Sequence, residues 1–244
     1  MIELFEIDKI NPHAYDHAEW AIDIRHVMIL YNLLLVADFG RVLEIGTHMG
    51  ASTAAFLKAQ GKKGFQLHLC DLSFEPHIKK ICANSATAEK IFLHECASAE
   101  YLADAPCFDF AFLDGSHIAE HVMNEFELLS MNGIDSILLH DHRTQLLSNF
   151  KDKPWFDGAY FLSERLRHSR NWYCVEDMGR RENELTDRGL FFATKRQDLC
   201  RLMRAIFVEL SNVPYSQLRS LALPMTDACD NCRKGNHLKG VENV

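Results

Sequence analysis

The stretch RVLEIGTHMGAST, residues 41–53, decides the fold of this chain. It starts as a short apolar run, turns at two glycines, Gly46 and Gly50, and continues into a helical segment over 51–60. Glycines in a turn allow positive backbone φ angles and a close approach of other groups. A buried strand that enters a helix through such a turn is typical of the first unit of a parallel α/β sheet.

The same alternation of apolar runs and helical segments continues along the chain. Strands are predicted at 41–46, 65–71, 90–95, 108–114, 135–141, 171–177 and 189–195. Helices are predicted at 18–39, 51–60, 75–86, 97–102, 118–130, 157–170 and 198–210. This rhythm predicts a doubly wound, Rossmann-like α/β fold. We expect a mostly parallel seven-stranded sheet with helices on both faces and an antiparallel last strand.

Composition and charge exclude several classes of partner. Hydrophobic residues make up 48% of the chain and charged residues 25%, as in ordinary globular proteins. The net charge of −8 argues against a nucleic-acid surface. The longest apolar stretch, 27–37, is too short to cross a membrane. With no secretion signal at the start and eight cysteines, the sequence predicts a protein of the reducing cytoplasm.

Acidic residues and a histidine stand where the predicted strands end. In parallel α/β sheets, ligands bind beyond the carboxyl ends of the strands. Asp71 ends the second strand, 21 residues beyond Gly50, where a carboxylate can accept hydrogen bonds from two ribose hydroxyls. The helix after the glycine turn offers free N–H groups to a carboxylate or phosphate. These features predict a nucleoside-containing cofactor.

Two classes of nicotinamide enzyme fit the sequence poorly. Dinucleotide enzymes favour a G-x-G-x-x-G turn, and Thr47-His48 does not supply its second glycine. Short-chain dehydrogenases need Tyr-x-x-x-Lys, and none of the six tyrosines has a lysine four residues on. Hydride transfer therefore lacks its acid.

The order of motifs resembles that of class I S-adenosylmethionine-dependent methyltransferases. The motifs are E-x-G-x-x-x-G-x-S (44–52), Asp71, FAFLDGSH (110–117) and SILLHDH (136–142). The sequence is most similar to the small-molecule O-methyltransferase branch that includes macrocin-type sugar O-methyltransferases. The resemblance covers roughly residues 40–195 and implies S-adenosyl-L-methionine as the cofactor. It implies these cofactor-binding residues: Glu44, Gly46, Thr47, Gly50, Ser52, Asp71, Ser98 and Asp114.

At the acceptor end, the resemblance implies a divalent metal site made by Asp114, His140 and Asp141. His140 departs from the usual acidic residue. Mg²⁺ prefers oxygen ligands, whereas imidazole suits Zn, Mn, Fe or Ni. Either the site binds a different metal, or His140 faces elsewhere. The expected catalytic residues are Asp114, Asp141 and one of two candidate bases, His117 and His142.

The resemblance also implies an organisation and a reaction. An N-terminal helical segment (1–39) precedes a methyltransferase domain that binds S-adenosylmethionine (40–196), and a helical appendage with a polar tail (197–244) follows. The expected reaction is methyl transfer to a hydroxyl of a small molecule, with metal assistance and a homo-oligomer left open. The alternative is a catalytically inactive cofactor-binding subunit or scaffold. Nucleic-acid methylation fits poorly with the net charge.

The C-terminal tail carries part of a zinc-binding pattern. Cys229, Cys232 and His237 have the spacing of three zinc-knuckle ligands, but Glu242 stands at the fourth position. An exposed tail with two free thiols is the competing interpretation, and the sequence favours it because the flanking residues are polar and without periodicity.

Overall fold

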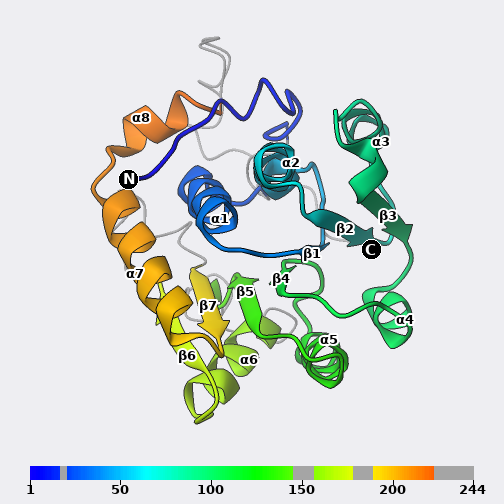
Figure 1. Ribbon diagram of the computed structural model, residues 1–244, viewed down its shortest axis with the longest axis vertical. Helices are drawn as coiled ribbons and strands as arrows, with labels where there is room; N and C mark the ends of the chain where they lie inside the picture. The colour runs from blue at the N-terminus through cyan, green and yellow to red at the C-terminus, as the bar shows by residue number, and fades with distance from the viewer. Residues whose placement is uncertain (17–20, 145–156, 178–188, 223–244) are drawn as a thin grey trace, which may run out of the picture.

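The computed structural model describes residues 1–16, 21–144, 157–177 and 189–222, and within these ranges the chain forms one seven-stranded sheet (Figure 1). The strands are β1 (Arg41–Ile45), β2 (Gln66–Asp71), β3 (Ile91–Glu95), β4 (Phe110–Leu113), β5 (Ser136–His140), β6 (Tyr173–Glu176) and β7 (Leu190–Thr194). Their order is β3-β2-β1-β4-β5-β7-β6. Strands β1 to β5 pair in parallel, and β7 is antiparallel to both β5 and β6. The predicted fold class is confirmed.

Helices cover both faces of the sheet. They are α1 (Ile24–Val36), α2 (Ala51–Lys63), α3 (Pro76–Ala83), α4 (Ser98–Ala103), α5 (Ala119–Met131), α6 (Gly158–Arg167), α7 (Gln197–Ser211) and α8 (Tyr215–Arg219), with a 3-10 turn η1 (Ala88–Lys90). Figure 1 shows α1 and α2 on one side of the sheet and α4 and α5 on the other. No described helix is both long and apolar enough to cross a membrane.

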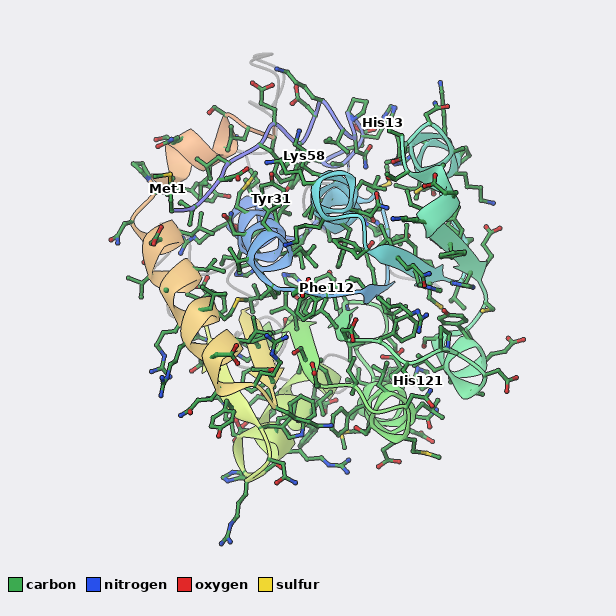
Figure 2. The ribbon with its side chains drawn as sticks, in the orientation of Figure 1. Met1, His13, Tyr31, Lys58, Phe112 and His121 are labelled. Atoms are coloured by element: carbon green, nitrogen blue, oxygen red, sulfur yellow. The ribbon has the colours of Figure 1, made fainter. Side chains whose placement is uncertain are left out.

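Alternation along the strands gives each face its own hydrophobic core. Val42, Phe110 and Phe112 point toward α1, α2 and α7, and Figure 2 shows Phe112 in the middle of the molecule. Leu43 and Ile137 point the other way, toward α5 and α6. Burial of the strands on both faces explains why they read as continuous apolar runs.

The strand order reverses between β1 and β4, which lie side by side although β2 and β3 come between them in sequence. A crevice opens at such a switch point, beyond the carboxyl ends of the strands. The residues that follow β1, β4 and β5 therefore meet at one edge of the sheet.

The first predicted helix is shorter than expected. The sequence predicted a helix over 18–39, but α1 runs only from Ile24 to Val36. The carboxylate of Asp23 accepts a hydrogen bond from the Arg25 N–H, and this N-cap fixes the start of the helix. Residues 17–20 lie outside the described residues.

The helices outside the central domain share its core. Residues of α1 and α7 belong to the same buried cluster as Val42 and Phe112 of the sheet. The core therefore continues across the predicted domain boundaries near residues 40 and 197, and these boundaries stay predictions. The residues of the partial zinc-binding pattern in the tail, Cys229, Cys232 and His237, lie outside the described residues.

Candidate active site

A pocket of about 270 Å³ lies at the edge where β1, β4 and β5 end. Its floor is the glycine turn after β1, and its far wall comes from the residues that follow β4 and β5. The N-terminal part of the chain covers it. The residues that line it are Ala14, Ala21, Ile22, Gly46, Thr47, His48, Met49, Gly50, Ala51, Ser52, Asp114, Gly115, His117, His140 and Asp141.

The backbone conformation and the close packing of the turn require glycine at both positions. Gly46 and Gly50 have φ angles of 86° and 77°, in the left-handed region. A Cβ atom on Gly46 would lie 2.4 Å from the backbone oxygen of Asp114. A Cβ atom on Gly50 would meet the side chain of Ile78 at 2.3 Å. Both glycines let neighbouring segments approach the turn closely.

Asp71 holds the turn from the end of β2. Its Oδ2 accepts hydrogen bonds from the backbone N–H of Thr47 at 2.7 Å and from the Thr47 hydroxyl at 2.9 Å. The backbone N–H of His48 donates to the same oxygen at 3.3 Å. Asp71 itself is not among the residues that line the pocket. Asp71 thus orders the turn at the predicted position.

Glu44 supports the turn from below and does not line the pocket. The carboxyl group is fully buried, and the hydroxyl of Thr53 donates to its Oε2 at 2.8 Å. Burial raises the pKa of Glu44 to about 8, although hydrogen bonds from Ser52 and Thr53 oppose the shift. Glu44, which the resemblance implied as a cofactor-binding residue, therefore contacts the turn and not the pocket.

Ser98 lies outside the pocket lining and bonds to a residue that sequence reasoning missed. Its hydroxyl donates to Oε1 of Glu125, a buried carboxyl of α5. Burial raises the pKa of Glu125 to about 7. The sequence did hold a signal: Glu125 stands at helical spacing from Val122 and Leu129, on the apolar face of α5.

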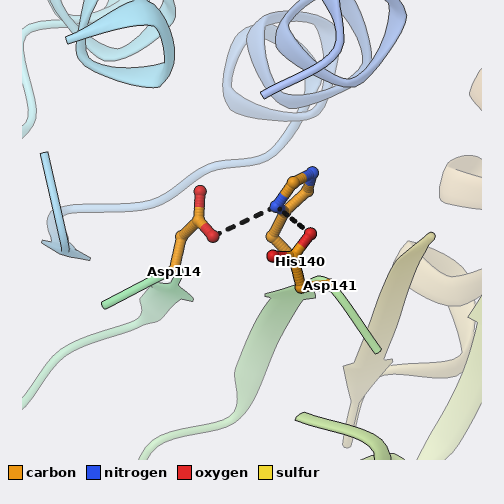
Figure 3. A group of neighbouring side chains, drawn as sticks. All are labelled: Asp114, His140 and Asp141. Carbon is orange, nitrogen blue, oxygen red and sulfur yellow. Dashed lines mark hydrogen bonds and ion pairs between the residues drawn. The ribbon is translucent and has the colours of Figure 1, made fainter. Parts of the chain in front are cut away.

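Two carboxylates and an imidazole gather at the ends of β4 and β5 (Figure 3). Nδ1 of His140 lies 3.1 Å from Oδ1 of Asp114 and 3.0 Å from Oδ1 of Asp141. Burial alone would lower the pKa of His140, but the two carboxylates outweigh it and raise the pKa to about 10. The structure brings together the three residues that the sequence predicted as metal ligands.

Asp141 holds its position through an unusual backbone conformation. Its φ is 61°, in the left-handed region that few non-glycine residues adopt. The backbone N–H of Asp141 donates to the carbonyl of Gly189 at 3.1 Å. Gly189 itself has a φ of 80°. Strain of this kind persists only where the surroundings fix it, and it is common at functional sites.

The two candidate bases lie in different places. His117 lines the pocket, is 26% exposed, and has its Nε2 3.6 Å from Oδ2 of Asp141. His142 is buried away from the pocket lining, with Nε2 3.1 Å from Oε2 of Glu176 and its ring against Phe191. Burial lowers the pKa of His142. Of these two histidines, His117 is the one that lines the pocket.

The cluster of Asp114, His140 and Asp141 fits a divalent ion. One ligand atom from each residue lies within 4.8 Å of the others, and His140 and Asp141 are buried. One imidazole nitrogen with two carboxylate oxygens suits Mn²⁺, Fe²⁺ or Zn²⁺ better than Mg²⁺. The raised pKa of His140 favours its protonated form, and an ion bound through Nδ1 would have to displace that proton.

Comparisons with known proteins agree with the fold. Residues 43–135, less than half of the chain, match a methyltransferase domain family. No protein with a curated description matches the chain. Among solved structures, the chain is similar to the O-methyltransferase TomG from Streptomyces achromogenes, involved in tomaymycin synthesis and solved with SAM. The identity is 17%, the match covers 80% of this chain and 91% of that chain, and the TM-score is 0.61.

Two further structures give the same picture. The O-methyltransferase from Bacillus cereus in complex with SAH has 14% identity and a TM-score of 0.60, covering 78% of this chain and 90% of that chain. The SAH-bound methyltransferase PaMTH1 from Podospora anserina has 14% identity and a TM-score of 0.58, covering 81% and 90%. The chain therefore has the Rossmann-like fold of S-adenosylmethionine-dependent methyltransferases, with a methyltransferase domain matched over residues 43–135.

Proposed function

We propose that the protein transfers a methyl group from S-adenosylmethionine to a hydroxyl of a small molecule. One observation carries this function: a single pocket joins the glycine turn after β1 to a cluster of histidine and carboxylate side chains after β4 and β5. The first half suits a nucleoside cofactor with a carboxylate. The second half suits activation of an oxygen nucleophile.

The cofactor end offers partners for two polar parts of S-adenosylmethionine, the ribose and the carboxylate of the methionine part. Oδ1 of Asp71 would accept a hydrogen bond from a ribose hydroxyl, while Oδ2 continues to hold Thr47 and His48. The free N–H groups at the start of α2, near Ser52, would receive the carboxylate of the methionine part. S-adenosylmethionine, when bound, supplies a methyl group that its sulfonium centre has already activated.

The acceptor end supplies proton removal and alignment. His117 would take the proton of the acceptor hydroxyl, and the neighbouring carboxylate of Asp141 would stabilise the imidazolium that forms. Asp114, His140 and Asp141 would hold a divalent ion, which lowers the pKa of a hydroxyl bound to it. Holding the acceptor oxygen in line with the methyl group supplies the rest of the acceleration.

Calorimetric titration with S-adenosylhomocysteine tests the cofactor assignment. We expect a Kd between roughly 1 μM and 1 mM, the range in which enzymes commonly bind substrates. NADH at the same concentrations is the control ligand, because the glycine turn lacks the dinucleotide spacing. Binding of NADH in place of S-adenosylhomocysteine would reject the assignment.

A methyl-transfer assay tests the reaction. Radiolabelled S-adenosylmethionine is incubated with a panel of sugars and phenols, with added Mn²⁺ or with EDTA. A labelled product that disappears with EDTA supports the metal-assisted reaction, and activity that is insensitive to EDTA rejects the metal. Cofactor binding without transfer to any acceptor in the panel would favour the alternative, a catalytically inactive binding subunit.

A further inference from the structure

The imidazole of His140 packs against a second buried histidine, which comes from α1. The rings of His26 and His140 meet edge to face, with centroids 5.3 Å apart and planes at 78°. Strand alternation explains the contact: Leu138 packs on the α1 side of the sheet, and His140 lies two residues further along β5. His26 has no exposed surface.

His26 contacts the carboxylate of Asp177, which also pairs with Arg25. Nε2 of His26 lies 3.4 Å from Oδ2 of Asp177, and the guanidinium NH1 of Arg25 lies 3.9 Å from the same oxygen. Asp177 follows β6 directly, and its backbone N–H donates to the carbonyl of Leu190 in β7 at 2.9 Å. The carboxylate is therefore anchored to the same sheet that carries His140.

Burying these charged side chains is unfavourable for the free energy of folding. Arg25 and Asp177 are only 5% and 3% exposed, and Nε and NH1 of Arg25 are buried with no hydrogen-bond partner among the described residues. Replacing such buried ion pairs with apolar side chains is often neutral or stabilising. Burying polar groups without partners is unfavourable. A buried ion pair that contributes little to folding, but holds the ring that contacts His140, points to a role in the pocket.

We propose that His26, held by Asp177, is a positioning residue that fixes the ring plane of His140. With the ring fixed, Nδ1 of His140 stays directed at the carboxylates of Asp114 and Asp141. Without it, the imidazole can rotate about its broad χ2 torsion, and Nδ1 leaves the space between the carboxylates. The predicted effect on ion affinity rests on the metal site of the proposed function, whereas the effect on the ring does not.

Three variants of the full chain test this role. His26→Ala removes the ring, and Asp177→Asn keeps the shape but weakens the hold on His26. His68→Ala is the matched control, because His68 is also a buried histidine but belongs to a ring cluster with His94 and Tyr101, outside the pocket lining. Circular dichroism and thermal unfolding show whether each variant folds, and S-adenosylhomocysteine titration reports on the separate glycine turn.

Two readouts report on His140. Mn²⁺ binding followed by electron paramagnetic resonance is expected to weaken about 10- to 100-fold in His26→Ala, the usual effect of losing a group that orients a metal ligand. In the metal-free protein, the Nδ1–H proton of His140 should be visible by NMR in the parent, because the carboxylate of Asp114 accepts from it and that of Asp141 lies 3.0 Å away. It should broaden through exchange with water in His26→Ala, and both effects should be smaller in Asp177→Asn.

The outcomes separate the alternatives. Unchanged Mn²⁺ affinity and an unchanged His140 N–H signal in a folded His26→Ala would overturn the positioning role, and His26 would be a packing residue only. Equal losses in His68→Ala would overturn it too, because they would show a general effect of destabilisation. If the parent binds no Mn²⁺, the metal site of the proposed function is wrong, and the N–H signal decides the role of His26 by itself.

Discussion

The two halves of the pocket are built in different ways. The cofactor end is made of backbone: the glycine turn, the start of α2, and the N–H groups that donate hydrogen bonds to Asp71. The acceptor end is made of side chains, in which His140 is balanced between Asp114 and Asp141. Backbone geometry depends on the packing of the whole sheet, whereas a balanced charge cluster can be altered locally. We therefore expect mutations to separate folding from chemistry at the two ends.

The largest expected effect comes from Gly46→Ala. The new Cβ would lie 2.4 Å from the Asp114 oxygen and 2.6 Å from the Gly115 Cα, both of them backbone atoms. The φ of 86° adds strain. We expect a loss of about 3 kcal/mol or more in the free energy of unfolding, measured in urea. Because Asp114 must move, both ends of the pocket would be damaged together.

Gly61→Ala is the control for this prediction. Gly61 lies inside α2, and a Cβ there would meet nothing within 4 Å. Alanine should stabilise the helix by about 0.5–1 kcal/mol. If Gly46→Ala were as stable as Gly61→Ala, the close approach of the turn to β4 would be wrong.

Asp141→Asn should separate chemistry from folding. The parent cluster holds two carboxylates and one imidazolium, so removing one negative charge leaves a balanced pair of His140 and Asp114. We expect the thermal midpoint to change little, while Mn²⁺ affinity falls by about 100-fold or more because a ligand is lost. Calorimetric titration with Mn²⁺ checks the affinity, and an unchanged Kd would exclude Asp141 from the metal site.

The sequence could not tell whether His117 or His142 is the catalytic base, and substituting each of them gives a test with a smaller expected effect. His117→Gln should lower kcat by about 100-fold or more, because a general base is lost, with S-adenosylhomocysteine affinity retained. His142→Gln keeps a donor to Glu176 and should leave kcat near the parent value. The opposite result would make His142 the base and would require its ring to leave Glu176.

The sequence predicted the sheet because apolar runs, glycines and helical spacing are local signals. It also placed Asp71, Asp114 and His140 correctly at the edge, since the carboxyl ends of parallel strands share one side. The roles of His117 and His142 could not be separated, because β5 ends at His140 and Asp141 adopts a positive φ. This breaks the alternation from which side-chain directions are read.

The sequence also could not predict contacts between residues that are far apart along the chain. Asp177 and His26 are far apart along the chain, and nothing local in either segment indicates that they meet. Glu125 is a different case, because a carboxyl on the apolar face of α5 was visible in the pattern. What the pattern could not give was its partner, Ser98, which lies on another helix.

The smallest expected effect concerns Glu125, whose folded-state pKa is raised to about 7 from 4.5 because of burial. Between these pH values the folded protein keeps a proton that the unfolded chain releases, so stability falls as pH rises from 4.5 to 7 and stays lower above. The pKa difference corresponds to at most about 3 kcal/mol. Glu125→Gln should therefore unfold like the parent near pH 4 and be more stable than the parent at pH 8. Glu127→Gln, an exposed position on the same helix, should show no such trend, and the same result for both variants would contradict the burial argument.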